Sequence, residues 1–255
     1  HAAIINGASY TLENCGEEGH VWAEIDVESL GADETVDVVE PDEDIGSDYA
    51  HTNRALRFAG NDTTTVATFS IKFYYTPEFA ANTPDISGYI DQVVSVTNQG
   101  YANSGVPLVA TAHCIEAATI NDNTQNLFHS FMYMKHTPKT LRGGADAAAL
   151  LVNAYGDKKY RCGRAEIDAI GYGDTVSITK KDCAIRHHTF AHEIGHNIGL
   201  RHDIERDPTT WPYPYGHGHY FSPQHRTIMA TFSFTHTRVN YYSSPSLIFP
   251  NTGTP

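Results

Sequence analysis

The chain has 255 residues, of which 40% are hydrophobic and 18% are charged, a composition typical of a globular protein with a substantial core. Its formal net charge of −13 argues against nucleic acid as the main partner, because phosphate contacts need Lys and Arg. No apolar run approaches the roughly 20 residues that span a bilayer, so we expect no membrane span.

The negative charge is concentrated at the start of the chain. Residues 1–60 hold 14 Asp and Glu against two Arg, whereas residues 61–255 hold 16 acidic and 15 basic side chains. We therefore expect a separate acidic segment over 1–60 and a folded domain over 61–255. Within the segment, residues 20–25 are β-like, and residues 31–48 are typical of an exposed linker. A solvated acidic surface is the alternative interpretation.

The folded domain begins with a strand, because apolar and polar residues alternate over 66–75. Thr83-Pro84-Asp85 predicts a helix start with proline at the first helical position, and Gly105 can end that helix. Three further strands and a last helix are predicted at 106–112, 147–155, 161–167 and 187–199. Strand, helix and strand in this order predict an α/β layered domain, and the remainder of the chain is loop-dominated.

One motif carries chemistry. His192 and His196 are four residues apart, so on a helix they face the same way and can hold one zinc ion. Glu193 follows the first of them and projects beside the metal. Gly199 permits the left-handed backbone that ends a helix, and the chain then returns His202 as a third ligand. Three protein ligands leave the fourth position open for water, which is the catalytic arrangement.

The mechanism follows from that ligand set. Zinc lowers the pKa of its water to about 7 and polarises the scissile carbonyl. Glu193 then accepts the water proton and delivers it to the leaving amine, first as a general base and afterwards as an acid. A core helix with satisfied histidines is the alternative for the first two histidines alone, and Gly199 and His202 together argue against it.

The pattern HExxHxxGxxH resembles the metzincin zinc endopeptidases. Asp203, directly after the third histidine, marks the reprolysin and adamalysin branch, and Met229 in Thr227-Ile228-Met229-Ala230 matches the Met-turn below the zinc. The resemblance implies an upper subdomain over 61–199, with a mixed five-stranded sheet and long helices. A small irregular lower subdomain follows over 200–255. The fold class is thus α/β (α+β).

The resemblance also implies the kind of substrate. In that family the strand matching 161–167 borders the cleft and pairs with an extended peptide. The carboxyl end resembles secreted relatives such as the peptidyl-Asp metalloendopeptidase group. Their Asp preference is not carried over, because no matching specificity residue is identified. Arg201 and Arg186 are the nearest basic candidates in sequence, and an exposed, solvated side chain is expected for each.

Four cysteines allow two disulfides. Cys162 and Cys183 both lie shortly before the zinc helix, and we expect them to pair. Cys15 and Cys114 would then tie the acidic segment to the second strand. The alternative is a cysteine switch, in which residues 1–60 resemble a pro-segment. The thiolate of Cys15 then occupies the open coordination position of the zinc ion. That switch would leave Cys114 unpaired, so we favour the bridge.

The sequence therefore predicts a secreted, monomeric zinc endopeptidase that acts on extended protein or peptide substrates. The chain begins at His1, from which we expect a removed secretory signal or a processed end. The sequon at Asn61 could carry a glycan. Related enzymes also bind calcium, which no motif here predicts. Alternatives are a zymogen covered by the acidic segment, a silent binding protein of the same fold, and a second metal site among His217, His219 and His225.

Overall fold

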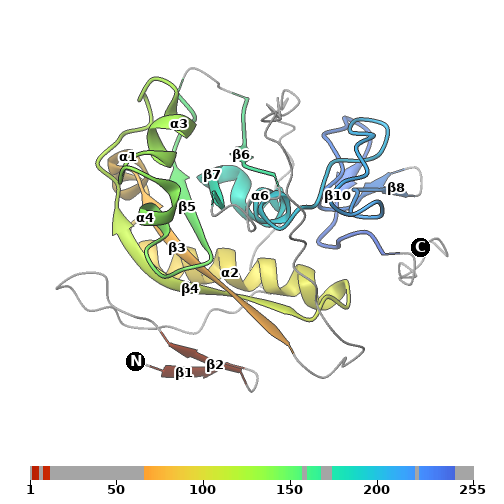
Figure 1. Cartoon of the computed structure of the whole chain (residues 1–255), viewed down its shortest axis with the longest axis horizontal. Coiled ribbons are helices and arrows are strands. Elements are labelled where there is room, and N and C mark those ends of the chain that lie inside the picture. The colour runs from red at the N-terminus through yellow and green to blue at the C-terminus, as the bar shows by residue number, and fades with distance from the viewer. Residues whose placement is uncertain are drawn as a thin grey trace.

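The computed structural model describes residues 66–156, 160–167, 174–221 and 224–244, and the strand residues 2–5 and 8–11 (Figure 1). The strands are β1 (Ala2–Ile5), β2 (Ala8–Thr11), β3 (Ala67–Tyr75), β4 (Leu108–Ala117), β5 (Ala147–Val152), β6 (Gly163–Ala165), β7 (Val176–Lys180), β8 (Tyr220–Phe221), β9 (His225–Arg226) and β10 (Thr237–Arg238). The helices are α1 (Pro77–Ala81), α2 (Ile86–Asn103), α3 (Leu127–Met132), α4 (Pro138–Arg142), α5 (Lys181–Ala184) and α6 (Thr189–Asn197).

Most of the predicted acidic segment lies outside the described residues. Within it, β1 and β2 form an antiparallel pair. The β-like piece at 20–25, the linker at 31–48 and the sequon at Asn61 are all outside the described ranges. The division at residue 60 therefore stays a prediction.

A five-stranded mixed sheet organises the domain, in the order β4-β3-β5-β7-β6. Strands β4, β3, β5 and β7 run parallel, and β6 pairs antiparallel with β7 at one edge. Helix α6 contacts β6 and β7, so it lies along that edge of the sheet. The mixed five-stranded sheet confirms the predicted fold class.

Two apolar clusters cover the two faces of this sheet, and the central strand β5 shows how its sequence divides between them. Ala147, Ala149 and Leu151 belong to the cluster that also includes buried residues of α2 and α6. Ala148, Leu150 and Val152 belong to the cluster that includes buried residues of α3 and α4. Side chains alternate across a strand, so a wholly apolar strand is buried on both faces.

The long helix α2 begins two residues later than predicted, at Ile86 in place of Pro84. Asp85 is its N-cap, and the Asp85 carboxylate accepts a hydrogen bond of 2.9 Å from the Gly88 N–H. Pro84 therefore precedes the cap and is not the first helical residue. A carboxylate cap satisfies an otherwise orphaned N–H, which explains why the helix starts after Asp85. Gly105 follows the helix with a φ of 65°, as its predicted role requires.

The part after α6 is small and partly ordered into strands. The two-residue strands β8, β9 and β10 form a three-stranded sheet in the order β10-β9-β8, within the residues predicted to be loop-dominated. In Figure 1 this sheet lies beyond α6, on the side away from α3 and α4. Among the described residues, no helix combines the length and apolar character needed to cross a bilayer.

Candidate metal centre

Helix α6 carries the motif, and its sequence is buried from end to end. All nine residues of α6 are buried, including His192, Glu193 and His196. Gly199 follows with a φ of 93°, a backbone conformation that side chains with a Cβ rarely adopt. The Leu200 N–H then donates to the Gly195 carbonyl at 2.9 Å. Gly199 thus turns the chain at the end of the helix, as the sequence predicted.

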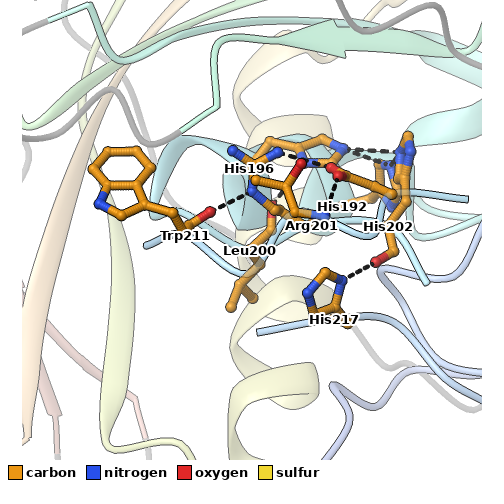
Figure 2. A network of polar contacts seen from close by, with 9 residues as sticks. His192, His196, Leu200, Arg201, His202, Trp211 and His217 are labelled. Carbon is orange, nitrogen blue, oxygen red and sulfur yellow. Dashed lines mark hydrogen bonds and ion pairs between the residues drawn. The ribbon is translucent and has the colours of Figure 1, made fainter. Parts of the chain in front are cut away.

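The turn brings three imidazoles together. The Nε2 atoms of His192, His196 and His202 are separated by 3.1, 3.1 and 3.2 Å. Figure 2 shows the three rings pointing toward one another. The Nδ1 atoms of His192 and His196 each lie 2.8 Å from a backbone carbonyl, of Ile228 and Leu200 respectively. A carbonyl only accepts, so Nδ1 carries the proton and Nε2 presents a lone pair.

Such an arrangement of lone pairs favours a cation. Facing lone pairs at these distances repel one another, and a metal ion between them converts the repulsion into coordination. Among the described residues, these three histidines are the group of His, Cys, Asp and Glu side chains able to hold a metal ion together. The histidines at 217, 219 and 225, considered above as a second site, form no such group there.

Burial keeps two rings of the triad in their neutral form. Burial lowers the pKa of His202 to about 2, with smaller contributions from the charges of His196 and Arg238. Burial lowers the pKa of His192 well below its usual range in the same way, with Arg238 as the next cause. A neutral imidazole is the form that binds a metal ion, so the protein environment prepares both rings as ligands.

Hydrogen bonds from neighbouring residues hold the loop that carries His202. His217, also buried, donates from Nδ1 to the His202 carbonyl at 2.8 Å (Figure 2). Asp203 accepts from the N–H and hydroxyl of Thr231, at 3.0 and 2.7 Å, and from the Arg206 N–H at 3.2 Å. The loop that carries His202 is thereby fixed to the segment after Met229. The sequence singled out Asp203 only as a family marker and did not identify the role of His217.

Met229 lies directly under the metal helix. It is 1% exposed, and a Cβ added at Gly195 would lie 3.1 Å from the Met229 methyl carbon. Because Gly195 lacks a side chain, the methionine packs against the helix backbone between the two histidines. The neighbouring Ile228 supplies the carbonyl that orients His192. This placement matches the Met-turn expected from the sequence.

Glu193 is buried between α6 and the edge strand. Its exposed fraction is 1%, and a Cβ added at Gly163 of β6 would lie 2.8 Å from its carboxyl carbon. The missing side chain of Gly163 therefore makes room for the carboxylate at the sheet edge, next to His192 in sequence. This role of Gly163 could not be predicted from the sequence, since a single glycine in a short strand has many explanations.

One of the two predicted disulfides is confirmed and the other stays a prediction. Cys162 and Cys183 are bonded, which confirms that prediction and links the start of β6 to α5. Cys114 is also disulfide-bonded, which argues against a switch that would leave it unpaired. Cys15 lies outside the described residues, so the Cys15–Cys114 bridge stays a prediction.

The expectation that Arg201 is solvated is wrong. Its side chain is 15% exposed, pairs with the Asp207 carboxylate at 2.8 Å and donates to the Trp211 carbonyl at 2.6 Å (Figure 2). An ion pair between loop residues offsets the cost of burying the guanidinium. Arg186 is exposed, as expected.

Two other arginines, not considered from the sequence, lie near the triad. Arg226 on β9 and Arg238 on β10 both donate to the carbonyl of Ala230, at 2.7 and 3.0 Å. Their positions in sequence, 24 and 36 residues beyond His202 by number, gave no indication that they come together.

Known proteins resemble the chain over this region. Residues 87–203 match the family described as Metallo-peptidase family M12B Reprolysin-like. Two proteins of Stenotrophomonas maltophilia (strains R551-3 and K279a), both named peptidyl-Asp metalloendopeptidase, are each 31% identical over 264 residues. The match covers 96% of this chain and 60% of each relative, so the chain spans about 60% of their length. A solved chain titled "Structure of a chaperone-substrate complex" shares the fold, with a TM-score of 0.55 and 22% identity over 74% of this chain and 34% of that one.

Proposed function

We propose that the chain is a secreted zinc-dependent endopeptidase of the reprolysin-like M12B metallopeptidases, the family whose model matches residues 87–203. The observation that carries the proposal is the convergence of three buried imidazoles on the helix and turn that also carry the buried carboxylate of Glu193. The named activity of the relatives supports it. The Cys162–Cys183 disulfide supports an oxidising, extracellular setting.

The donor set fits zinc. Nitrogen ligands on a tetrahedral zinc ion at about 2.0–2.1 Å lie about 3.3–3.4 Å apart. The Nε2 atoms of His192, His196 and His202 are 3.1–3.2 Å apart, close to that spacing. Three protein ligands are characteristic of catalytic zinc sites, in which the remaining position is open to water. When bound, the ion supplies Lewis-acid activation of a water molecule and of the scissile carbonyl.

The protein's own residues move the proton and place the substrate. The Glu193 carboxylate accepts a proton from the attacking water and passes it to the leaving amine nitrogen as the C–N bond breaks. Among the described strands, β6 is at the edge of its sheet and pairs with β7 alone. An extended peptide that pairs with the open side of β6 runs past Gly163, and hence past Glu193. The name of the relatives, peptidyl-Asp metalloendopeptidase, suggests cleavage beside aspartate, which we also propose for this chain.

Casein hydrolysis by wild type and Glu193→Ala, with zinc content recorded for both, tests the assignment. We expect wild type to cleave, and Glu193→Ala to retain zinc but cleave at least about 100-fold more slowly, the scale of a lost general base. Glu205→Ala, at an exposed carboxylate, is the matched control and should cleave like wild type. Zinc-loaded, folded wild type that cleaves nothing would support a silent binding protein or a covered zymogen instead.

A further inference from the structure

Arg164 lies at the centre of β6, on the face of the sheet turned away from the metal helix. A Cβ added at its neighbour Gly163 would lie 2.8 Å from the Glu193 carboxyl carbon, so Gly163 faces α6. Successive side chains of a strand point to opposite faces. Accordingly, the Arg164 guanidinium carbon lies 4.4 Å from the ring centroid of Phe128 on α3. Arg164 thus places a positive charge one residue away from the strand position next to Glu193.

The ring of Phe128 holds the guanidinium in place. Phe128 is 4% exposed and belongs to the apolar cluster on the α3 face of the sheet. Ile178 of β7, which pairs opposite Arg164, belongs to the same cluster. A guanidinium stacked on a buried ring is attracted to the ring face and keeps the N–H donors around its own edge available. Arg164 therefore presents these donors in a defined plane.

The donors of Arg164 are not used by the part of the chain that the structure describes. No described residue accepts a hydrogen bond from its guanidinium or forms an ion pair with it, whereas the cations of Lys72 and Lys135 pair with Glu116. Arg164 is partly exposed, and none of its nitrogens is among the buried atoms without a partner, so its N–H groups reach solvent. A guanidinium in this state suits a carboxylate from another molecule, which it binds through charge-assisted and often paired hydrogen bonds.

An extended peptide on the open side of β6 presents side chains to both faces of the sheet. Residues opposite each other on neighbouring strands point to the same face. The peptide residue opposite Gly163 therefore faces Glu193, and the next one faces Arg164. Resting on the proposed function, we propose that Arg164 forms a subsite for an acidic side chain of the substrate, at the peptide residue that pairs opposite it.

Two other interpretations are less suitable. Arg161 also carries a positive charge, with its guanidinium carbon 5.5 Å from the ring centroid of Tyr155, but it precedes β6 and makes no strand pair with β7. Alternatively, Arg164 only covers Phe128. That purely structural role predicts a loss of stability on substitution and no dependence on the charge of the substrate.

A positional scan of peptides tests the proposal. Each peptide carries the same cleavage site, identified in casein by mass spectrometry, with Asp or Asn placed in turn at each position around the scissile bond. Fluorescence assays give kcat/KM. In Arg164→Gln, the Asp-over-Asn ratio should fall about 5- to 30-fold at one position, a scale between an exposed ion pair and a buried hydrogen bond to a charged group. The ratios at the two flanking positions should not change, because those side chains face α6.

Further variants separate recognition from structure. Arg164→Lys keeps the charge but not the paired donors, so it should retain part of the preference. Lys139→Gln removes an exposed charge on α4 and is the matched control, with every ratio unchanged. If Arg164→Gln is folded and zinc-loaded but loses activity equally on Asp and Asn peptides, Arg164 is only structural and the proposal is wrong. If Arg164→Gln does not fold, a wild-type ratio at every position in Arg164→Lys overturns the proposal.

Binding to the inactive Glu193→Gln protein distinguishes failure of this proposal from failure of the proposed function. Fluorescence anisotropy of the same labelled peptides gives Kd with and without Arg164→Gln in that background. A protein that never cleaves but binds Asp over Asn through Arg164 keeps this inference and loses the enzyme. A protein that cleaves and shows no Arg164-dependent discrimination in either assay keeps the enzyme and loses this inference.

Discussion

Replacing Gly163 by alanine should damage catalysis while sparing the metal site. The added Cβ would lie 2.8 and 2.9 Å from two carbons of the Glu193 side chain, where ordinary contact begins near 3.4 Å. The flexible carboxylate must therefore move by roughly 0.5–1 Å. A displacement of about 1 Å at a reacting group costs up to about 100-fold in rate, so we expect kcat to fall about 10- to 100-fold.

Casein hydrolysis rates, zinc content and thermal unfolding together measure this effect. Zinc content should be unchanged, because Gly163 does not touch the triad in the contacts described. Gly144→Ala is the matched control, since the nearest neighbour of a Cβ there, His113 Nε2, lies 3.9 Å away. If Gly163→Ala cleaves within about threefold of wild type, the Glu193 carboxylate is not held in place by β6 and its assignment as the base weakens.

Three other predictions concern the support of the triad. His217→Ala should weaken zinc binding about 10-fold in a chelator competition. His217→Asn, which keeps a donor near the position of Nδ1, should recover part of the lost zinc affinity. Equal zinc affinity in wild type and both variants would contradict the role of His217 in holding His202. Asp203→Ala should lower the free energy of unfolding by about 2–3 kcal/mol in denaturant titrations, and a loss below about 0.5 kcal/mol would refute the tether to Thr231. The pKa of His188 is lowered to about 4 and that of His202 to about 2, so below pH 6.5 the unfolded state binds protons that the folded state does not. The metal-free protein should therefore lose about 2 kcal/mol per histidine between pH 7 and pH 5, and a flat stability profile would show that these rings are not held neutral.

The metal centre could be predicted from sequence because its geometry is local. A four-residue spacing fixes the relative directions of His192 and His196 on any helix. Gly199 predicts the turn that brings His202 back toward them. The central strands were predictable for a similar reason, because period-two alternation and wholly apolar runs are properties of adjacent residues. Strand β7, the short helices and the strands of the small sheet were not predicted, since their few residues carry no such periodicity.

The surroundings of the triad depend instead on contacts between residues far apart in the chain. His217 reaches His202 through a loop, Gly163 admits Glu193 from another strand, and Arg238 reaches His187 from 51 residues away in sequence. Each of these residue types is common and has several ordinary explanations when it is viewed alone. The ligands of the ion are thus encoded in one short helix and the turn that follows it, whereas the side chains that support them come from distant parts of the chain. A substitution at one of these distant positions can therefore change the site while the motif itself stays intact.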